Sequence, residues 1–482
     1  MVGLRELTIH FLHTNDIHSR FEQMPIIAYQ VRMMRKRWEA LGEPVIVLDL
    51  GDHMDRMHPV TEGTEGQANV DILKTLGADL ITIGNNEGLT FTKEQLAKLY
   101  KDVPFKILLS NMADRETGQP PAWAEPFLLL EVGGIRLGFL GVTAAFQAFY
   151  NLMGWEMSSP QEVVAGWIHR CRDQVDQWVI LSHVGIHEDI RLADVLPPGS
   201  LVFGAHTHHA FPEGEWLGDI LLAAAGKFGE YLGHVEVRYD LDKRRVSQMR
   251  AELIAMEPTR PADPETQAVI SRHRKAAAQV LSQPTAWVPE ALHIRYDAES
   301  DLGNLLADGL RRIANADIGL VNSGQLLGNI EAGMLSKGTL HQICPSPINP
   351  CRARISGEVL LKSLEQSLLR EFQQRPIRGF GFRGKVLGNL STSGLRVQYD
   401  PNGPAYRKIR RVWVGDELLE PEKMYTVGMI DMFTFGVGYP ELQKGLDFTF
   451  YLPEFLRDIL EQDLQNPRFV REAKRRLWQP LS

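Results

Sequence analysis

The sequence predicts an α/β protein built from two domains, and three observations carry this prediction. Short runs rich in β-branched residues alternate with longer amphipathic stretches through the first half, which is typical of strands covered by helices. A segment with three prolines, at residues 256–264, interrupts the alternation. New strand and helix patterns then follow to the C-terminus. We therefore expect a first domain at residues 1–255, a linker and connecting helix at 256–284, and a second α/β domain at 285–482.

The strands of the first half are predicted from short apolar runs. These runs are residues 7–12, 45–50, 80–83, 105–109, 135–142, 178–181, 200–203 and 220–223. Between them, residues 25–38 and 67–76 have helical spacing. A third helix is expected to begin near Pro264, because proline favours the first helical turn. One face of that helix would carry Val269, His273, Ala276 and Val280.

Composition excludes several classes of function. The 52 basic and 60 acidic residues give a net charge of −8, so a general nucleic-acid-binding surface is not expected. No apolar run reaches the roughly 20 residues that span a bilayer, and the first residues lack the pattern of a signal peptide. The scattered cysteines Cys171, Cys344 and Cys351 argue against a disulfide framework. We therefore expect a cytoplasmic protein that acts neither at a membrane nor on a nucleic-acid polymer.

Metal-ligating residue types follow five of the predicted strands. The segments are Asn15-Asp16-Ile17-His18, Gly51-Asp52, Gly84-Asn85-Asn86-Glu87, Ser182-His183 and Gly204-Ala205-His206-Thr207-His208. Ligand sites in α/β folds gather beyond the carboxyl ends of strands, so these segments can converge on one site. Their carboxylates, imidazoles and amide oxygen suit cations such as zinc, manganese, iron or cobalt.

The combination favours two metal ions. Two cations about 3.5–4 Å apart, bridged by a carboxylate, can clamp a phosphate and lower the pKa of a bridging water. Asp52 is the natural bridge. Each motif alone has a plainer alternative, since an Asp-x-His loop often caps a turn and His206 and His208 could form a solvent-exposed pair. The occurrence of all five in the first half of the chain favours the metal site.

The order of these motifs resembles the calcineurin-like metallophosphoesterases, specifically the bacterial 5'-nucleotidase and metallophosphatase family. Asn322-Ser323-Gly324 resembles that family's C-terminal domain, so the resemblance extends over nearly the whole chain. It implies a four-layer α/β/β/α first domain and a second domain that shapes substrate access. It also implies that Asp16, His18, Asp52 and His208 hold one metal, while Asp52, Asn85, His183 and His206 hold the other.

The chain departs from the family where a catalytic His and an Asp are expected after Gly-Asn. Asn86 and Leu89 occupy those positions. The amide of Asn86 can donate a hydrogen bond to a phosphoryl oxygen, and we predict this catalytic role for it. It cannot supply a proton, and general acid help is typically worth about 10²–10⁴-fold in rate. His53 and His187 are the nearest alternative acids in sequence, each with the plainer alternative of a supporting or surface histidine.

The nucleotide-binding positions of the second domain also differ from the family pattern. Gln325 follows Asn322-Ser323-Gly324 where an Arg is expected, residues 344–350 replace one aromatic ring, and Phe435-Gly436-Val437-Gly438-Tyr439 lacks an Asp. The predicted substrate contacts are Asn322, Gly324, Arg383, Phe433, Phe435 and Tyr439. The alternatives are an aromatic core cluster, and a solvated turn around Phe382 and Arg383.

Together these features predict a dimetal hydrolase that cleaves phosphate esters, with nucleotides as expected substrates, by attack of a metal-bridged hydroxide. Its expected role is in nucleotide catabolism. Two alternatives stay open: a metal- and nucleotide-binding protein without turnover, and a hydrolase of phosphodiesters or pyrophosphates. The resemblance also implies that the connecting helix, residues 269–281, acts as a hinge. The sequence leaves the metal identity and the oligomeric state open.

Overall fold

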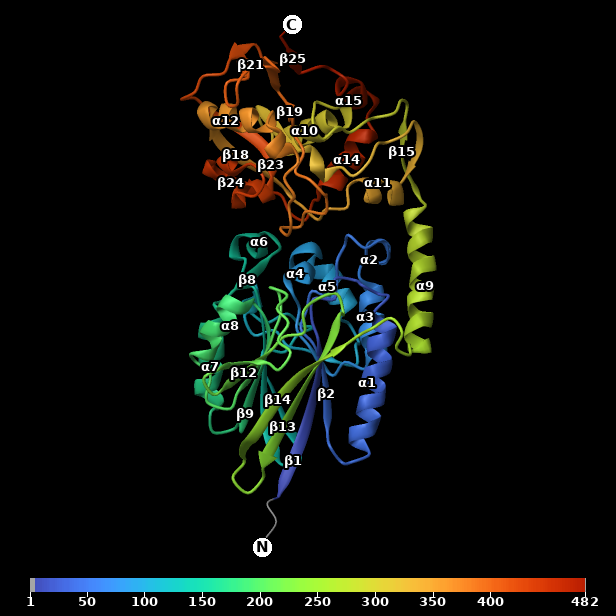
Figure 1. Ribbon diagram of the computed structural model, residues 1–482, viewed down its shortest axis with the longest axis vertical. Coiled ribbons are helices and arrows are strands. Elements are labelled where there is room, and N and C mark those ends of the chain that lie inside the picture. The colour runs from blue at the N-terminus through green and yellow to red at the C-terminus, as the bar shows by residue number, and fades with distance from the viewer. Residues whose placement is uncertain (1–4, 482) are drawn as a thin grey trace. The chain divides into compact units, whose positions relative to one another are not determined.

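The computed structural model describes residues 5–481, which divide into two compact units. The division falls between Ala277 and Ala278, inside the long helix α9 (Pro264–Leu281). We call the part before the division unit 1 and the part after it unit 2. Both units contain sheets with helices packed against them, as Figure 1 shows, so the predicted two-part α/β architecture is confirmed.

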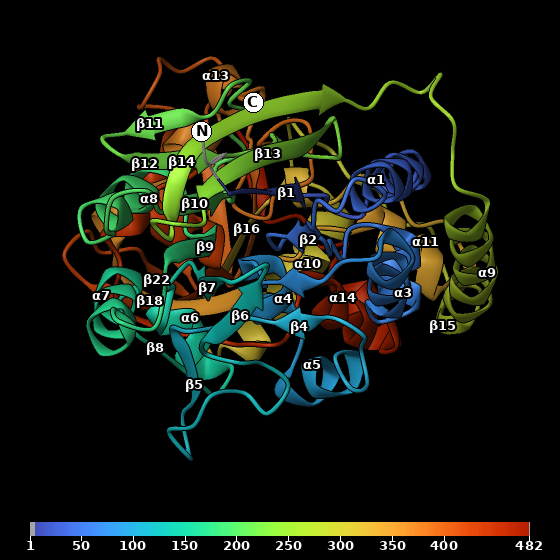
Figure 2. The same ribbon diagram turned by 90° about the horizontal axis from the view of Figure 1, so that it is seen from below.

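Unit 1 is a sandwich of two six-stranded sheets. The first sheet has the order β14-β13-β1-β2-β3-β4 and the second has the order β11-β12-β10-β9-β7-β6. The central strands β1 to β4 run parallel to one another, as do β7, β9, β10 and β12. Figure 2 shows α1 and α3 on one flank of the sandwich and α7 and α8 on the other. The four predicted α/β/β/α layers are therefore present.

The strands of unit 1 keep their order because the inner faces of both sheets share one apolar core. Phe11 of β1 and Phe203 of β10 have ring centroids 5.7 Å apart across this core. A separate apolar cluster lies on the outer face of the second sheet, where Val164 and Leu192 of the helices meet Ile180. Burial on both faces explains why the central strands are continuous apolar runs rather than alternating ones.

All eight predicted strands of the first half are present, and the structure adds a long hairpin, β13–β14, that the sequence analysis missed. The strands of unit 1 are β1 (Glu6–Thr14), β2 (Val45–Asp49), β3 (Leu80–Ile81), β4 (Lys106–Ile107), β5 (Met112–Asp114), β6 (Leu128–Val132), β7 (Ile135–Thr143), β8 (Trp155–Met157), β9 (Gln177–His183), β10 (Leu201–Gly204), β11 (Glu215–Leu217), β12 (Ile220–Ala223), β13 (Tyr231–Asp240) and β14 (Arg245–Ala255). Its helices before α9 are α1 (Met24–Glu39), α2 (Pro59–Gly63), α3 (Gln67–Leu76), α4 (Asn85–Thr90), α5 (Lys93–Leu99), α6 (Gln147–Leu152), α7 (Pro160–Cys171) and α8 (Ile186–Ala193).

Helix α9 begins at Pro264 as expected, and its buried face includes only His273 of the four residues that were expected to share a face. The buried residues are Thr266, Ile270, His273 and Ala277, whereas Ala276 and Val280 are exposed and Val269 is half-buried. His273 lies 2.9 Å from an Asp71 carboxylate oxygen, and Ala277 packs where a side chain on Gly63 would clash. Specific contacts with α2 and α3 therefore set the rotation of the helix, which apolar spacing alone does not fix.

Unit 2 is built around a five-stranded sheet in the order β19-β16-β23-β18-β24, with α10 packed on its central strands. A four-stranded sheet (β22-β21-β20-β25) and the ribbon β15–β17 complete it. Its strands are β15 (Pro284–Val288), β16 (Ile318–Asn322), β17 (Gly333–Ser336), β18 (Pro350–Ser356), β19 (Leu390–Ser393), β20 (Leu395–Tyr399), β21 (Ile409–Val414), β22 (Glu417–Leu418), β23 (Met424–Ile430), β24 (Leu446–Phe450) and β25 (Trp478–Pro480). Its helices are α10 (Asp301–Ile313), α11 (Lys337–Ile343), α12 (Gly357–Ser367), α13 (Arg370–Gln373), α14 (Leu456–Leu464) and α15 (Pro467–Glu472), with 3₁₀ turns η1 (Ser323–Gln325), η2 (Asp431–Phe435) and η3 (Pro440–Lys444).

Within residues 5–481, no helix combines the length and the apolar character needed to cross a bilayer. Cys171, Cys344 and Cys351 are all buried free thiols.

Candidate metal centre

The seven predicted ligands follow five strands of unit 1, as the sequence analysis predicted. β1, β2 and β3 are neighbours in the first sheet, and β9 and β10 are neighbours in the second. Because these strands are parallel within each sheet, their carboxyl ends lie at one edge of the sandwich. The ligand loops of both sheets meet at that edge.

Backbone strain marks these loops. Five residues have φ in the left-handed region, namely Asp16 at 51°, His18 at 46°, Asp52 at 48°, His206 at 72° and His208 at 60°. Residues with side chains adopt this conformation at a cost of about 1–3 kcal/mol each, and such strain gathers at functional sites. The backbone of these loops therefore adopts unfavourable conformations that point the ligand side chains toward the site.

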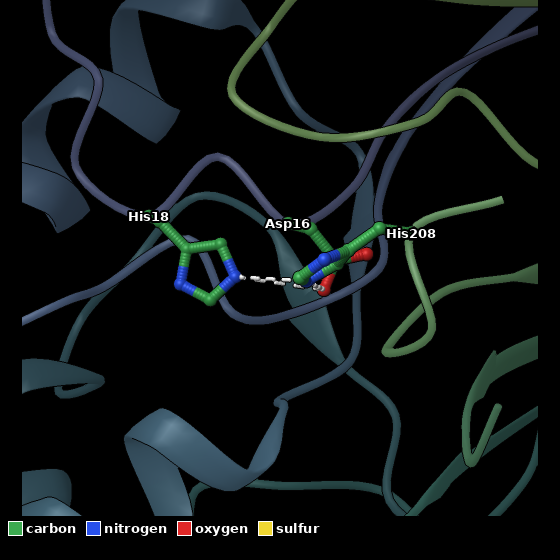
Figure 3. Close-up of side chains that lie close together, drawn as sticks. All are labelled: Asp16, His18 and His208. Atoms are coloured by element: carbon green, nitrogen blue, oxygen red, sulfur yellow. Dashed lines mark hydrogen bonds and ion pairs between the residues drawn. The ribbon is translucent and has the colours of Figure 1, made fainter. Parts of the chain in front are cut away.

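Asp16, His18 and His208 form the first cluster, shown in Figure 3. The Nε2 atoms of the two imidazoles are 3.3 Å apart. Asp16 Oδ1 lies 3.8 Å from His18 Nε2 and 3.5 Å from His208 Nε2. One cation can contact three ligand atoms at these separations.

Asp52, His183 and His206 form the second cluster. Asp52 Oδ1 lies 3.4 Å from His183 Nε2, while Asp52 Oδ2 lies 3.8 Å from His18 Nε2 in the first cluster. The two carboxylate oxygens thus face different clusters. This is the geometry that a bridging carboxylate needs.

Two buried polar atoms without hydrogen-bond partners indicate that a cation could bind at the second cluster. Asn85 Oδ1 and His183 Nε2 are buried, and neither has a hydrogen-bond partner among the described residues. An unsatisfied buried polar atom costs about 1–3 kcal/mol, which a metal ligand bond would offset. Carboxylate and amide oxygens with imidazole nitrogens form a ligand set that divalent cations accept. The residues present therefore fit two divalent ions.

Neighbouring groups hold the ligands in place. His183 Nδ1 donates a 2.7 Å hydrogen bond to the Leu50 carbonyl, so Nε2 is the nitrogen that faces the site, where a bound cation would replace its proton. Asn15 Nδ2 and the His206 backbone N–H donate to Asp16 at 2.9 and 3.0 Å. Each donor fixes one ligand atom toward the site.

Glu87 holds the site together, a role that the sequence analysis missed. Its buried carboxylate accepts hydrogen bonds from the backbone N–H groups of Asp52, Met54 and Gly84 at 2.8 to 3.0 Å. Burial and the charge of Asp52 raise the pKa of Glu87 to about 8. Only glycine fits at position 84, because the Asp52 side chain lies close to its backbone and a Cβ there would be 2.1 Å from Asp52 Oδ1. Both residues belong to the quoted Gly-Asn-Asn-Glu motif, but only the fold shows what they contact.

The charges of the clusters act on one another. Burial lowers the pKa of His183, but the carboxylates of Asp52 and Asp16 outweigh it and raise that pKa to about 10. Burial would raise the pKa of Asp52, yet His183 and His18 bring it well below its usual range. For His206, burial lowers the pKa to about 4. The carboxylates thus create the negative potential that attracts cations.

Asn86 lies beside the first cluster, with its amide engaged by the protein. Asn86 Nδ2 donates to the Met54 carbonyl at 3.0 Å and lies 3.0 Å from His18 Nδ1. Its backbone N–H donates to Asp52 Oδ1 at 2.8 Å. Asn86 thus positions His18 through its side-chain amide and Asp52 through its backbone N–H, and the predicted contact of the amide with a phosphoryl oxygen would compete with its bond to Met54.

Neither alternative acid is placed to give a proton. His53 is 2% exposed, and burial lowers its pKa to about 3, so the ring is neutral. His187 lies on the exposed surface of α8. Leu89 lies on α4, where the family pattern has the Asp.

The predicted substrate residues of unit 2 divide into buried and exposed ones. Asn322 is fully buried, donates to the Leu387 carbonyl at 2.8 Å, and accepts from Gln325 Nε2 at 3.0 Å. A side chain on Gly324 would meet the Val386 carbonyl at 2.0 Å. This segment therefore packs within unit 2 rather than facing solvent.

The aromatic residues divide in the same way. Phe433 and Tyr439 are fully buried, with their rings edge to face, and Tyr439 donates to the Gly388 carbonyl. The alternative of a core cluster fits these two rings. Phe435 is 48% exposed, and its ring centroid lies 5.8 Å from that of Phe380, which the sequence analysis did not single out. Arg383 is half-buried, next to the buried Phe382.

Comparison with known proteins agrees with this geometry. Residues 9–210 match the family model for the calcineurin-like phosphoesterases, and residues 282–444 match the model for the 5'-nucleotidase C-terminal domain. The metallophosphoesterase YunD of Bacillus subtilis, itself uncharacterized, is 36% identical over 453 residues, which cover 94% of this chain and 98% of YunD.

More distant relatives are named as 5'-nucleotidases. Snake venom 5'-nucleotidase of Naja atra is 24% identical over 462 residues, covering 83% of this chain and 82% of the relative. The solved structure of a 5'-nucleotidase precursor from Thermus thermophilus aligns with 99% of this chain and 100% of its own, at a TM-score of 0.59 and 22% identity. This last likeness supports the shared fold.

Proposed function

Because the chain belongs to the calcineurin-like phosphoesterases with a 5'-nucleotidase C-terminal domain, and is therefore a metal-dependent phosphoesterase, we propose that its substrates are nucleotides. The reaction is hydrolysis of a phosphate ester at the centre in unit 1. Its role in the cell is then nucleotide catabolism.

The proposal assigns seven side chains to two divalent cations. The first is held by Asp16, His18, Asp52 and His208, and the second by Asp52, Asn85, His183 and His206. The observation that carries this assignment is the position of Asp52, whose two oxygens face different clusters. When bound, the cations polarise the phosphoryl group and acidify a bound water.

The protein's own groups prepare the site for that chemistry. The Leu50 carbonyl holds one proton of His183 on Nδ1, which directs Nε2 toward a cation. The Asn86 amide stands beside His18 and fixes its ring. The Asn86 side chain stands where the family pattern has its catalytic histidine, and an amide has no proton to give to a leaving group. We therefore propose that the site favours leaving groups that depart as anions without general acid help.

Base recognition is proposed for the exposed pair Phe380 and Phe435 in unit 2. Their ring planes are inclined by 33°. A base stacked between the two rings needs a separation of about 7 Å, which is two van der Waals contact distances. The ring centroids are 5.8 Å apart, so the rings would have to move apart by about 1 Å. Arg383 lies on the same segment as Phe380 and supplies positive charge. Asn322 and Gly324 then support the fold of this region instead of touching substrate.

Cytoplasmic location is proposed from the thiols. Cys171, Cys344 and Cys351 are free and buried, which suits a reducing compartment.

Hydrolysis by the purified, metal-loaded protein tests the proposal. Nucleoside monophosphates, sugar phosphates, dinucleotides and an activated aryl phosphate would be assayed with manganese, zinc, cobalt and magnesium in turn. Turnover of nucleotides, lost in Asp16→Asn, is the expected result. Tight nucleotide binding without turnover under any metal would favour the alternative of a binding protein, and selective turnover of sugar phosphates would refute nucleotides as the substrates.

A further inference from the structure

A phenylalanine ring lies against the first metal cluster and carries two cations. The Phe228 ring contacts His18 edge to face, with centroids 5.7 Å apart, and lies 6.5 Å from the His208 ring. Arg20 Cζ is 4.7 Å from the ring centroid, and Lys227 Nζ is 4.8 Å from it. Two positive groups are thus gathered within reach of candidate metal ligands.

The backbone fixes this ring in place. The Phe228 N–H donates a 2.8 Å hydrogen bond to the carbonyl of Asp16, a candidate ligand. Phe228 has φ of 60°, in the left-handed region that a bulky residue rarely adopts. Strain of this kind persists only where surrounding structure holds it, so the ring keeps its place relative to the cluster.

Within residues 5–481, neither Arg20 nor Lys227 forms an ion pair with an Asp or Glu. Two like charges near one ring repel each other, and the quadrupole of one phenylalanine offsets only part of that repulsion. Arg20 is exposed and Lys227 half-buried, so both can contact a ligand. An anion bound between them would relieve the repulsion.

We propose that Arg20, Lys227 and Phe228 form a subsite for a second phosphoryl group, joined to the scissile one through an anhydride oxygen. The proposal rests on the proposed function, since it places the scissile group at the metal centre. Arg20 binds phosphoryl oxygens through its guanidinium fork, and Lys227 adds a point charge.

The subsite agrees with the absence of a general acid at Asn86. Hydrolysis of a phosphoanhydride breaks the bond between the scissile phosphorus and the anhydride oxygen, and water supplies the hydroxyl that replaces it. The leaving phosphate keeps the electron pair as an anion, and one proton of the water passes to solvent. Phosphate monoanions are acids with a pKa of about 6, so this leaving group needs no proton from the protein.

Ligand binding to the manganese-loaded enzyme tests the subsite directly. Methylenediphosphonate, which resists hydrolysis, and inorganic phosphate would be titrated by calorimetry. The variants Arg20→Gln and Lys227→Gln keep much of the side-chain length and remove the charge. The double variant should bind the diphosphonate about tenfold more weakly and change phosphate affinity less than twofold. The preference of the wild-type enzyme for the diphosphonate over phosphate should also become smaller at high salt, because salt screens the charges of Arg20 and Lys227.

A matched control separates the subsite from general surface charge. Arg170 stacks on Trp167 at 4.0 Å, in the same type of contact, on α7. Arg170→Gln should leave both affinities unchanged. If the double variant loses affinity for phosphate and diphosphonate equally, or loses affinity for neither, the subsite proposal is wrong. The proposed function would not be affected by either result. If the wild-type enzyme binds neither anion and hydrolyses no ester, both proposals fall.

Discussion

The candidate metal ligands of unit 1 and two predicted substrate residues of unit 2 treat their buried polar groups differently. In unit 1, Asn85 Oδ1 and His183 Nε2 are buried without a partner, next to carboxylates and strained loops. In unit 2, Asn322 and Tyr439 are as deeply buried, but their polar groups bond to backbone carbonyls and to Gln325. The two ligand residues keep a polar atom unpaired, whereas Asn322 and Tyr439 use their polar groups to hold the loops around them.

This difference bears on where ligand chemistry resides. A buried polar atom left unpaired lowers stability unless a ligand satisfies it, and His183 Nε2 lies in a group of ligand atoms that one cation could satisfy. A buried polar atom that bonds to the backbone stabilises the loop that contains it. We therefore assign the chemistry to unit 1 and a supporting role to the Asn322 segment, with recognition left to exposed rings.

The largest expected effect comes from filling the space behind Asp52. Gly84→Ala would place a methyl group 2.1 Å from Asp52 Oδ1, so the bridging carboxylate must move. A displacement of about 1 Å can cost roughly 10²-fold in rate. We expect a loss of at least this size in kcat/KM, measured with an activated aryl phosphate. Gly166→Ala, where no atom lies within 4 Å of the new methyl, is the control and should remain active.

Asn86→His should restore a proton donor. We expect turnover of poor leaving groups to rise by about 10²-fold, and turnover of activated esters to rise much less, because only the former need acid help. Steady-state kinetics on a series of aryl phosphates would measure the slope against leaving-group pKa. An equal effect across the series would show that protonation is not what this site lacks.

Phe435→Ala tests whether unit 2 recognises bases through exposed rings. Loss of one stacking partner is worth about 1–3 kcal/mol, so KM for a nucleotide should rise about tenfold or more. KM for a phosphate ester without a base should not change. The control is Trp287→Ala, which removes another exposed ring of unit 2. A similar rise in that variant would argue against a specific base site.

The smallest effect concerns stability in unit 2. Burial raises the pKa of Asp431 from 3.8 to about 7, so its neutral form stabilises the fold at low pH. That contribution is lost as pH rises from about 3.8, where the unfolded chain ionises, to about 7, by at most about 1.4 kcal/mol per pH unit. Asp431→Asn should therefore raise the free energy of unfolding at pH 8 and change it little at pH 4, measured by urea denaturation. The exposed Asp447→Asn serves as control, and a matching rise in it would contradict this account.

The sequence predicted which residues gather in the candidate metal centre better than which residues of unit 2 are exposed, for a physical reason. The ligands follow strand ends, and parallel strands bring their carboxyl ends together, so Asp52 and His183 could be placed from order alone. The burial of Phe433 and Tyr439 depends on how distant loops pack, which periodicity does not reveal. The contacts of Phe228 with Arg20 were missed for the same reason, because the two residues are far apart in the chain.

The central claim is that two cations share Asp52. Metal content of the purified protein, measured after equilibrium dialysis against manganese, tests it most directly. The wild-type chain should bind two ions, and Asp52→Asn should bind fewer than two, while Asp431→Asn keeps both. Two ions bound as tightly in Asp52→Asn, or fewer than two in the wild-type protein, would contradict the account.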